Sequence, residues 1–200
     1  MKKILFVAIL AVASVMAYAQ PRAIGGRLGE FDGFSYEHGF GDSNMLEIEA
    51  GFNFGNRWGN RMVGWENGNE WHMYGHNVQV AATYDWIDPF NATFPWEHKG
   101  EWHWYMGVGG AGGFGWDART YVQGTGEVSS RDLGYSAHWG FVGAVGRVGV
   151  EYDFWFPLQL SIDYRPTLGA GLCDAGALGT QAGFYYDVFG LSLGVRYKFP

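Results

Sequence analysis

Residues 189–199 read FGLSLGVRYKF and alternate without a break between large apolar residues and small or polar ones. Because successive side chains of a strand point to opposite faces, this pattern predicts a β-strand with one apolar and one polar surface. Such a strand fits either a soluble β-protein or the wall of a membrane barrel. The remainder of the sequence has to distinguish these two settings.

The N-terminus has the features of a cleaved export signal. Lys2 and Lys3 precede an apolar run over Ile4–Met16, and Ala17-Tyr18-Ala19 supplies the small-x-small cleavage pattern. The apolar run is shorter than the roughly 20 residues of a membrane-spanning helix. We therefore expect a signal peptide over residues 1–19 and a single β-barrel domain over residues 20–200.

Composition narrows the class of protein further. The chain has a formal net charge of −7, which disfavours a nucleic-acid partner, because such partners need a basic surface. A single cysteine, Cys173, excludes an intrachain disulfide although export is expected. Glycine occurs 33 times and aromatic residues make up 18%, which favours sheet over helix. A membrane role would then require strands, since no apolar run after residue 19 approaches the length of a spanning helix.

Alternation predicts eight strands in total, which suits an up-and-down barrel with an even strand number. They are expected over residues 23–29, 34–40, 45–54, 76–86, 101–116, 138–154, 158–165 and 189–199. Long connections are expected over residues 55–75, 117–136 and 167–187, and a medium one that contains Pro89 and Pro95 over residues 88–99. Short and long connections alternate along the chain, although imperfectly. Such alternation is typical of outer-membrane barrels, in which periplasmic turns are short and outer loops are long.

An eight-stranded soluble barrel of the lipocalin type is the alternative, because its strands alternate in the same way. Two features favour the membrane barrel. Aromatic residues gather at strand ends on the apolar face, as in the girdles of outer-membrane barrels. They are Phe34, Phe54, Trp86, Trp102, Trp104, Phe154, Phe189 and Phe199.

The opposite face carries charges of both signs, which can pair inside a narrow lumen. They are Arg27, Glu37, Glu47, Glu49, Asp85, Arg147, Glu151, Asp163, Arg165 and Arg196. The fold expected is an all-β, eight-stranded antiparallel transmembrane barrel with a plugged polar lumen. Arg147 is expected to pair with Glu151 or Glu49, and a gate whose ion pairs exchange partners is the alternative to a fixed plug.

Several segments resemble the small OmpA/OmpX-like, porin-family outer-membrane barrels. They are the last two strands, residues 157–166 (PLQLSIDYRP) and 193–199 (LGVRYKF), with residues 23–29 (AIGGRLG) and 146–152 (GRVGVEY). The resemblance implies insertion by the outer-membrane assembly machinery, which reads a C-terminal strand that ends in an aromatic residue. Here Phe199 is penultimate and Pro200 is last. The resemblance implies no catalytic residues.

No catalytic, cofactor or metal site is expected. The run over residues 107–115 (GVGGAGGFG) lacks the Lys-Ser/Thr ending and the following helix of a phosphate loop. His72 and His76 would lie about 13 Å apart along a strand, too far for one ion. Ser136 and His138 face the same way, but no acid can be assigned as the third member of a triad.

Exposed aromatic residues in the outer loops are candidate contacts for a protein partner, glycans or lipopolysaccharide. They are Trp58, Trp65, Trp71, Tyr74 and Tyr121, with Tyr185 and Tyr186 in the last long connection. The function expected is a non-enzymatic protein of the outer membrane of a Gram-negative-type bacterium, with a structural, envelope-integrity or interaction-subunit role. A narrow diffusion pore and a lipid-modifying outer-membrane enzyme are the alternatives.

Overall fold

The computed structural model describes residues 21–29, 32–54, 61–66, 69–90, 99–123, 131–132, 137–174 and 179–199. The expected signal peptide lies outside these residues. Every described element is a strand, and all twelve strands join one sheet in which each pair is antiparallel. The strands are β1 Pro21–Gly29, β2 Asp32–Gly39, β3 Asn44–Asn53, β4 Arg61–Glu66, β5 Asn69–Pro89, β6 Glu101–Gln123, β7 Arg131–Asp132, β8 Ala137–Asp153, β9 Gln159–Tyr164, β10 Thr167–Asp174, β11 Thr180–Asp187 and β12 Leu191–Lys198.

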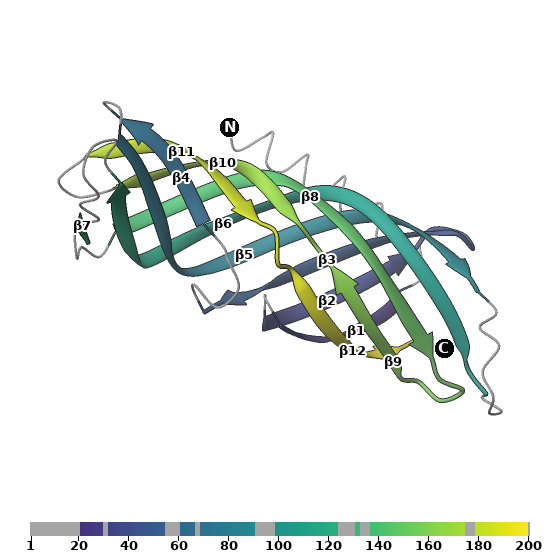
Figure 1. The fold of residues 1–200 in the computed structure, drawn as a ribbon. Helices are drawn as coiled ribbons and strands as arrows, with labels where there is room; N and C mark the ends of the chain where they lie inside the picture. Colours follow the sequence, from purple (N-terminus) through teal and green to yellow (C-terminus); the bar gives the residue numbers. More distant parts are fainter. Residues whose placement is uncertain are drawn as a thin grey trace, which may run out of the picture.

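The sheet closes on itself in two rings that share β5, β6 and β8. The wide ring runs β5–β3–β2–β1–β12–β9–β8–β6 and returns to β5. The narrow ring runs β5–β4–β11–β10–β8–β6 and also returns to β5. The three shared strands are long, with 21, 23 and 17 residues, and extend through both rings. Figure 1 shows β4, β10 and β11 at one end of the molecule and β1, β2, β9 and β12 toward the other.

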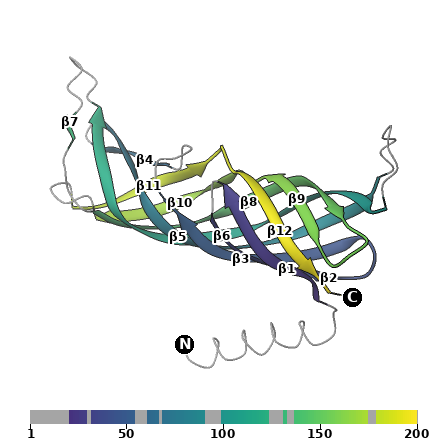
Figure 2. The same cartoon turned by 90° about the horizontal axis from the view of Figure 1, so that it is seen from below.

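The closing pair of the wide ring joins the two ends of the sheet. β1 pairs with β12 from Ala23↔Lys198 to Gly29↔Ser192, and β12 pairs with β9 on its other side. Figure 2 shows β1 and β12 side by side along their length.

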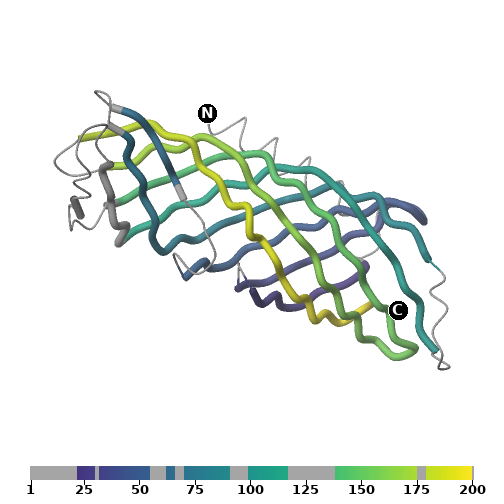
Figure 3. The backbone as a smooth tube through the Cα atoms, viewed as in Figure 1, coloured from purple at the N-terminus to yellow at the C-terminus, as the bar shows by residue number. Residues whose placement is uncertain are grey.

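The expected count of eight strands is not confirmed, although each expected segment contains a strand. Much of the three long connections is strand as well: residues 55–75 contain β4 and the start of β5, residues 117–136 contain the end of β6 and β7, and residues 167–187 contain β10 and β11. In β10 the exposed Leu168, Ala170 and Leu172 alternate with more buried neighbours. The glycine and alanine residues of this segment have weak strand propensity, so its two-residue alternation was not recognised from the sequence. The continuous course of the backbone through both rings is visible in Figure 3.

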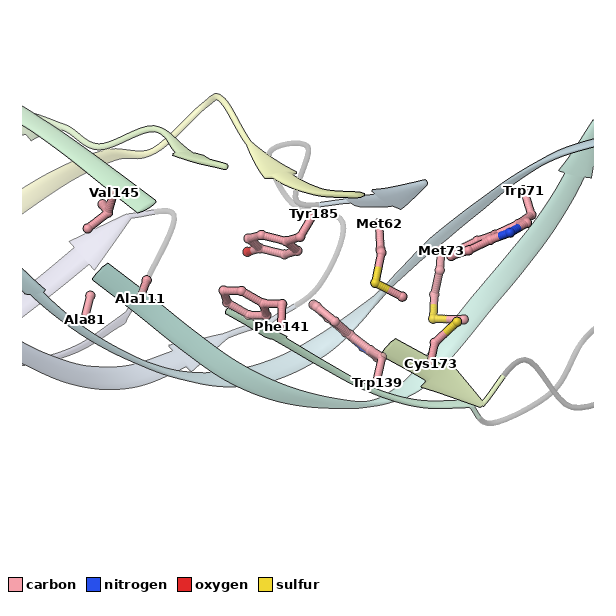
Figure 4. Close-up of a cluster of buried hydrophobic side chains, with 10 residues drawn as sticks. All are labelled: Met62, Trp71, Met73, Ala81, Ala111, Trp139, Phe141, Val145, Cys173 and Tyr185. Atoms are coloured by element: carbon pink, nitrogen blue, oxygen red, sulfur yellow. The ribbon is translucent and has the colours of Figure 1, made fainter. Parts of the chain in front are cut away.

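The two rings have different interiors, and β8 shows the change along one strand. Its buried residues are Trp139, Phe141 and Val145 in the narrow ring, and then Arg147, Glu151 and Asp153 in the wide ring. Aromatic and sulfur-containing side chains fill the narrow ring (Figure 4): Met62, Trp71, Met73, Trp139, Phe141, Cys173 and Tyr185. The rings of Phe141 and Tyr185 stack there with centroids 3.7 Å apart.

Candidate functional site

The most elaborate group of polar side chains lies inside the wide ring. The structure brings together all ten charged residues that alternation placed on the inner face, and each is at most 6% exposed. They come from seven strands and the β9–β10 junction, and are Arg27, Glu37, Glu47, Glu49, Asp85, Arg147, Glu151, Asp163, Arg165 and Arg196. We call this group the inner charge network.

Glu47 is the centre of the inner charge network. Its carboxylate accepts from Arg147 Nη1 at 2.6 Å, Arg196 Nη2 at 2.6 Å, Arg165 Nη2 at 2.7 Å and Arg27 Nη1 at 3.2 Å. The hydroxyl of Ser35 donates a further bond at 2.7 Å. Four guanidinium groups on one carboxylate would repel one another, so their other sides must meet additional acids.

Those additional acids surround the centre. Asp85 accepts from Arg147 at 2.8 Å, Asp163 is bound by Arg27, and Glu49 is bound by Arg165 and by Arg27 at 3.2 Å. Tyr105, also buried, donates to Asp163 at 3.0 Å and places its ring 4.1 Å below the Arg147 guanidinium. Charge-assisted bonds of this density fix the side chains of opposite walls to one another.

The expected partners of Arg147 were wrong. Arg147 pairs with Glu47 and Asp85, whereas Glu49 pairs with Arg27 and Arg165 and Glu151 with Arg22. Alternation along a strand fixes the face to which a side chain points. It does not fix the position around a ring, which depends on the order and stagger of all the strands.

A smaller group of charged side chains lies at the end of the wide ring where β1 begins and β12 ends. Arg22 contacts Glu37 at 3.2 Å, Glu151, and Asp153 at 3.7 Å, and Lys198 lies 3.4 Å from Asp153. Sequence reasoning missed Arg22, because strict alternation from the inward Ala23 and Arg27 turns its side chain outward. An irregularity in the β1–β2 register between Pro21 and Ala23 breaks that alternation.

One pocket reaches the network from the junction of the two rings. It has a volume of about 10 Å³, which is room for a single water molecule. Its lining includes Arg27, Glu49, Arg165 and Asp187. The described interior there is occupied by side chains rather than by open space.

The eight expected girdle residues are exposed or half-buried on the outer face. Phe34, Phe54 and Phe189 lie at the strand ends that border the narrow ring. The other five lie at the opposite ends of the strands and are Trp86, Trp102, Trp104, Phe154 and Phe199. The aromatic residues therefore form two belts at the two margins of the wide ring.

The expected loop contacts have mixed outcomes. Trp65 is 69% exposed, and Tyr74 and Tyr186 are half-buried. Trp71 and Tyr185 were wrongly placed at the surface, because their segments are strands whose inner faces fill the narrow ring. Trp58 lies outside the described residues, and Tyr121 belongs to β6 with its side chain outside the described set.

The two residues weighed as an enzymatic pair give no described site. Ser136 lies outside the described residues. His138 is exposed on the outer face, where its ring stacks on Phe114 with centroids 5.9 Å apart.

No family model matches the chain, and no curated protein matches it. The OmpA/OmpX-like resemblance therefore stays a prediction. A solved structure of a major outer membrane protein from Thermus thermophilus is similar to 90% of this chain and 98% of its own, at 11% identity and a TM-score of 0.44. None of the described residues forms a helix of the length and apolar character needed to cross a membrane.

Proposed function

We propose that the chain is a non-enzymatic integral β-barrel protein of the bacterial outer membrane, with a structural or interaction-subunit role and a closed lumen. One observation carries this proposal: the polarity of the sheet is inverted relative to a soluble β-barrel. The charged residues are inside, and large apolar side chains are exposed outside. In the wide ring Leu28 is 64% exposed, Val108 60%, Leu193 56% and Val195 50%.

Lipid accounts for this arrangement, and water does not. Exposing large apolar residues on every strand of a ring costs roughly 25 cal/mol for each Å² in water, whereas acyl chains cover such a surface without that cost. A closed ring also pairs the backbone groups of its wall, which a bilayer requires. The two aromatic belts then lie at the two water–lipid interfaces, with the wide ring between them.

The inner charge network supports a closed lumen over a diffusion pore. An ion passing through the wide ring would have to separate Glu47 from its guanidinium partners. Breaking one buried pair costs about 3–5 kcal/mol, and several would have to break together. On this proposal the partners of the chain are outer-membrane lipid and lipopolysaccharide, the assembly machinery during insertion, and a protein that binds the outer loops or the lipid face.

The proposal is tested by folding the purified chain into detergent and then into liposomes. We expect heat-dependent mobility on an SDS gel and resistance of the liposome-bound protein to extraction with urea. A folded, monodisperse protein in detergent-free buffer would overturn the proposal. In planar bilayers we expect no stable single-channel current while an open porin conducts in parallel. Stable currents would favour the pore.

A further inference from the structure

A second, smaller group of side chains, at the end of the wide ring away from the narrow ring, combines an imidazole with two carboxylates. His103 lies on β6 directly opposite Glu151 on β8, and Asp153 follows two residues later on the same face of β8. One donor atom from each of the three side chains lies within 4.8 Å of the others. The side chains of His103, Glu151 and Asp153 are only 14%, 0% and 9% exposed.

Each of these three side chains has a buried polar atom without a hydrogen-bond partner: His103 Nδ1, Glu151 Oε2 and Asp153 Oδ1. A buried polar atom in this state costs about 1–3 kcal/mol, so each of the three calls for a partner such as a metal ion or water. His103 Nδ1 lies 3.8 Å from Glu151 Oε1, beyond hydrogen-bond distance. The basic neighbours leave these atoms free. Arg22 contacts Glu151 through Oε1, and Lys198 contacts Asp153 through Oδ2 at 3.4 Å.

The charge around these three side chains favours a cation. The acids that face it are Glu37, Glu151 and Asp153, with the exposed Glu101 opposite Asp153 across the β6–β8 pair. The bases are Arg22 and Lys198, which are 20% and 29% exposed and so remain partly hydrated. Arg196 also reaches Glu37, at 3.2 Å, from the network side.

We propose that His103, Glu151 and Asp153 form a binding site for a divalent metal ion of the Zn²⁺ class. One imidazole nitrogen and two carboxylate oxygens are ligands that Zn²⁺ takes, whereas Mg²⁺ and Ca²⁺ prefer oxygen alone. Three protein ligands leave a fourth position for water. The ion would link β6 to β8 at the end of the wide ring that lies away from the narrow ring.

The test uses the full chain folded in detergent, stripped with a chelator and titrated with Zn²⁺ by calorimetry. Co²⁺ titration adds a visible absorption band that reports on coordination geometry. We expect one saturable equivalent of Zn²⁺, with affinity lowered at least about tenfold in His103→Ala and in Glu151→Gln. His138→Ala is the matched control, because that histidine is exposed on the outer face of β8, and it should bind as the unaltered chain does.

Heat-dependent gel mobility shows that each variant is folded before its titration. Absence of saturable binding in the unaltered chain would overturn the site and leave water as the partner of the three atoms. Binding that is equally strong in folded His103→Ala would overturn it as well. These outcomes are distinct from a failure of the proposed function, because a chain that enters liposomes but binds no Zn²⁺ contradicts the metal site alone.

Discussion

At the scale of single residues, the glycines of the wall divide into two kinds by the face to which they point. A Cβ on the inward Gly107 would overlap Asp85 Oδ1 and lie 2.5 Å from the Tyr84 carbonyl oxygen. A Cβ on the outward Gly110, three residues along β6, would meet its nearest atom at 3.8 Å. The inward glycine is therefore required by close packing, whereas the outward one is not.

Substitution of these two glycines should have different effects. Gly107→Ala should lower the free energy of unfolding by about 1–3 kcal/mol through overpacking. Gly110→Ala should leave it within about 1 kcal/mol, since alanine also restricts the unfolded chain. Guanidinium titration of both proteins in detergent micelles measures the difference. Equal stabilities would contradict the assignment of the two faces.

Arg147 provides a test of the inner charge network. Arg147→Leu should destabilise the fold by about 3–5 kcal/mol, because it removes the only cation that contacts Asp85 among the described residues. The thermal transition in detergent reports the loss. Adding Asp85→Asn should recover part of it, since the buried acid is then neutral. A double variant no more stable than Arg147→Leu would show that Asp85 does not depend on this pair.

Residue-level sequence reasoning succeeded where a single strand carries the information. Alternation placed the ten charged residues on one face. It missed Arg22, which a local register irregularity moves inward. It also missed the association of His103 with Glu151, because these residues are far apart in sequence and meet only through the β6–β8 register.

At the scale of elements, the β10–β11 hairpin and β4 depend on the aromatic interior that they enclose. Phe141 of β8 stacks on Tyr185 of β11, and Trp139 lies 5.8 Å from the same ring between centroids. The sequence predicted a connection here, because Gly and Ala dominate it. The large aromatic side chains require small inward residues beside them, since a Cβ on Gly183 would lie 2.6 Å from the indole of Trp71.

Loss of one aromatic side chain from this interior should destabilise the strands of the narrow ring selectively. Phe141→Ala should cost about 3–5 kcal/mol locally, through lost contacts and a cavity. Hydrogen exchange should accelerate in β10, β11 and β4, with β1 and β12 unchanged. Val142→Ala is the matched control, because Val142 is the next residue and is 70% exposed. Uniform acceleration across the sheet would contradict two separately filled rings.

At the scale of the whole molecule, the outer surface between the two aromatic belts is the part that a bilayer would cover. Leu193 lies on β12 between Phe189 and Phe199 and is 56% exposed. Leu193→Arg should lower the stability of the liposome-inserted protein by about 2–4 kcal/mol, because a charge there would lie near the bilayer midplane. Denaturant titration in liposomes measures this change.

Trp155→Arg provides the control for depth. Trp155 is 68% exposed in the turn between β8 and β9, beyond the belt, where an arginine should cost only about 0–1 kcal/mol. Equal losses for the two substitutions would contradict the proposed position of the bilayer. The sequence predicted this apolar surface strand by strand, but not the second ring, whose pairing depends on β4 meeting β11.

Because β1 and β12 pair directly, the closed sheet does not require the chain to begin at β1. Ala23 pairs with Lys198, and the Phe199 amide donates to the Arg22 carbonyl at 3.0 Å, so a short linker could join these ends without moving a strand. New termini could open in the tight turn where the Phe154 amide donates to the Leu158 carbonyl. Such a circular permutant should keep every strand pair and the heat-dependent mobility of the parent, so that strand order in the gene is separable from strand order in the wall.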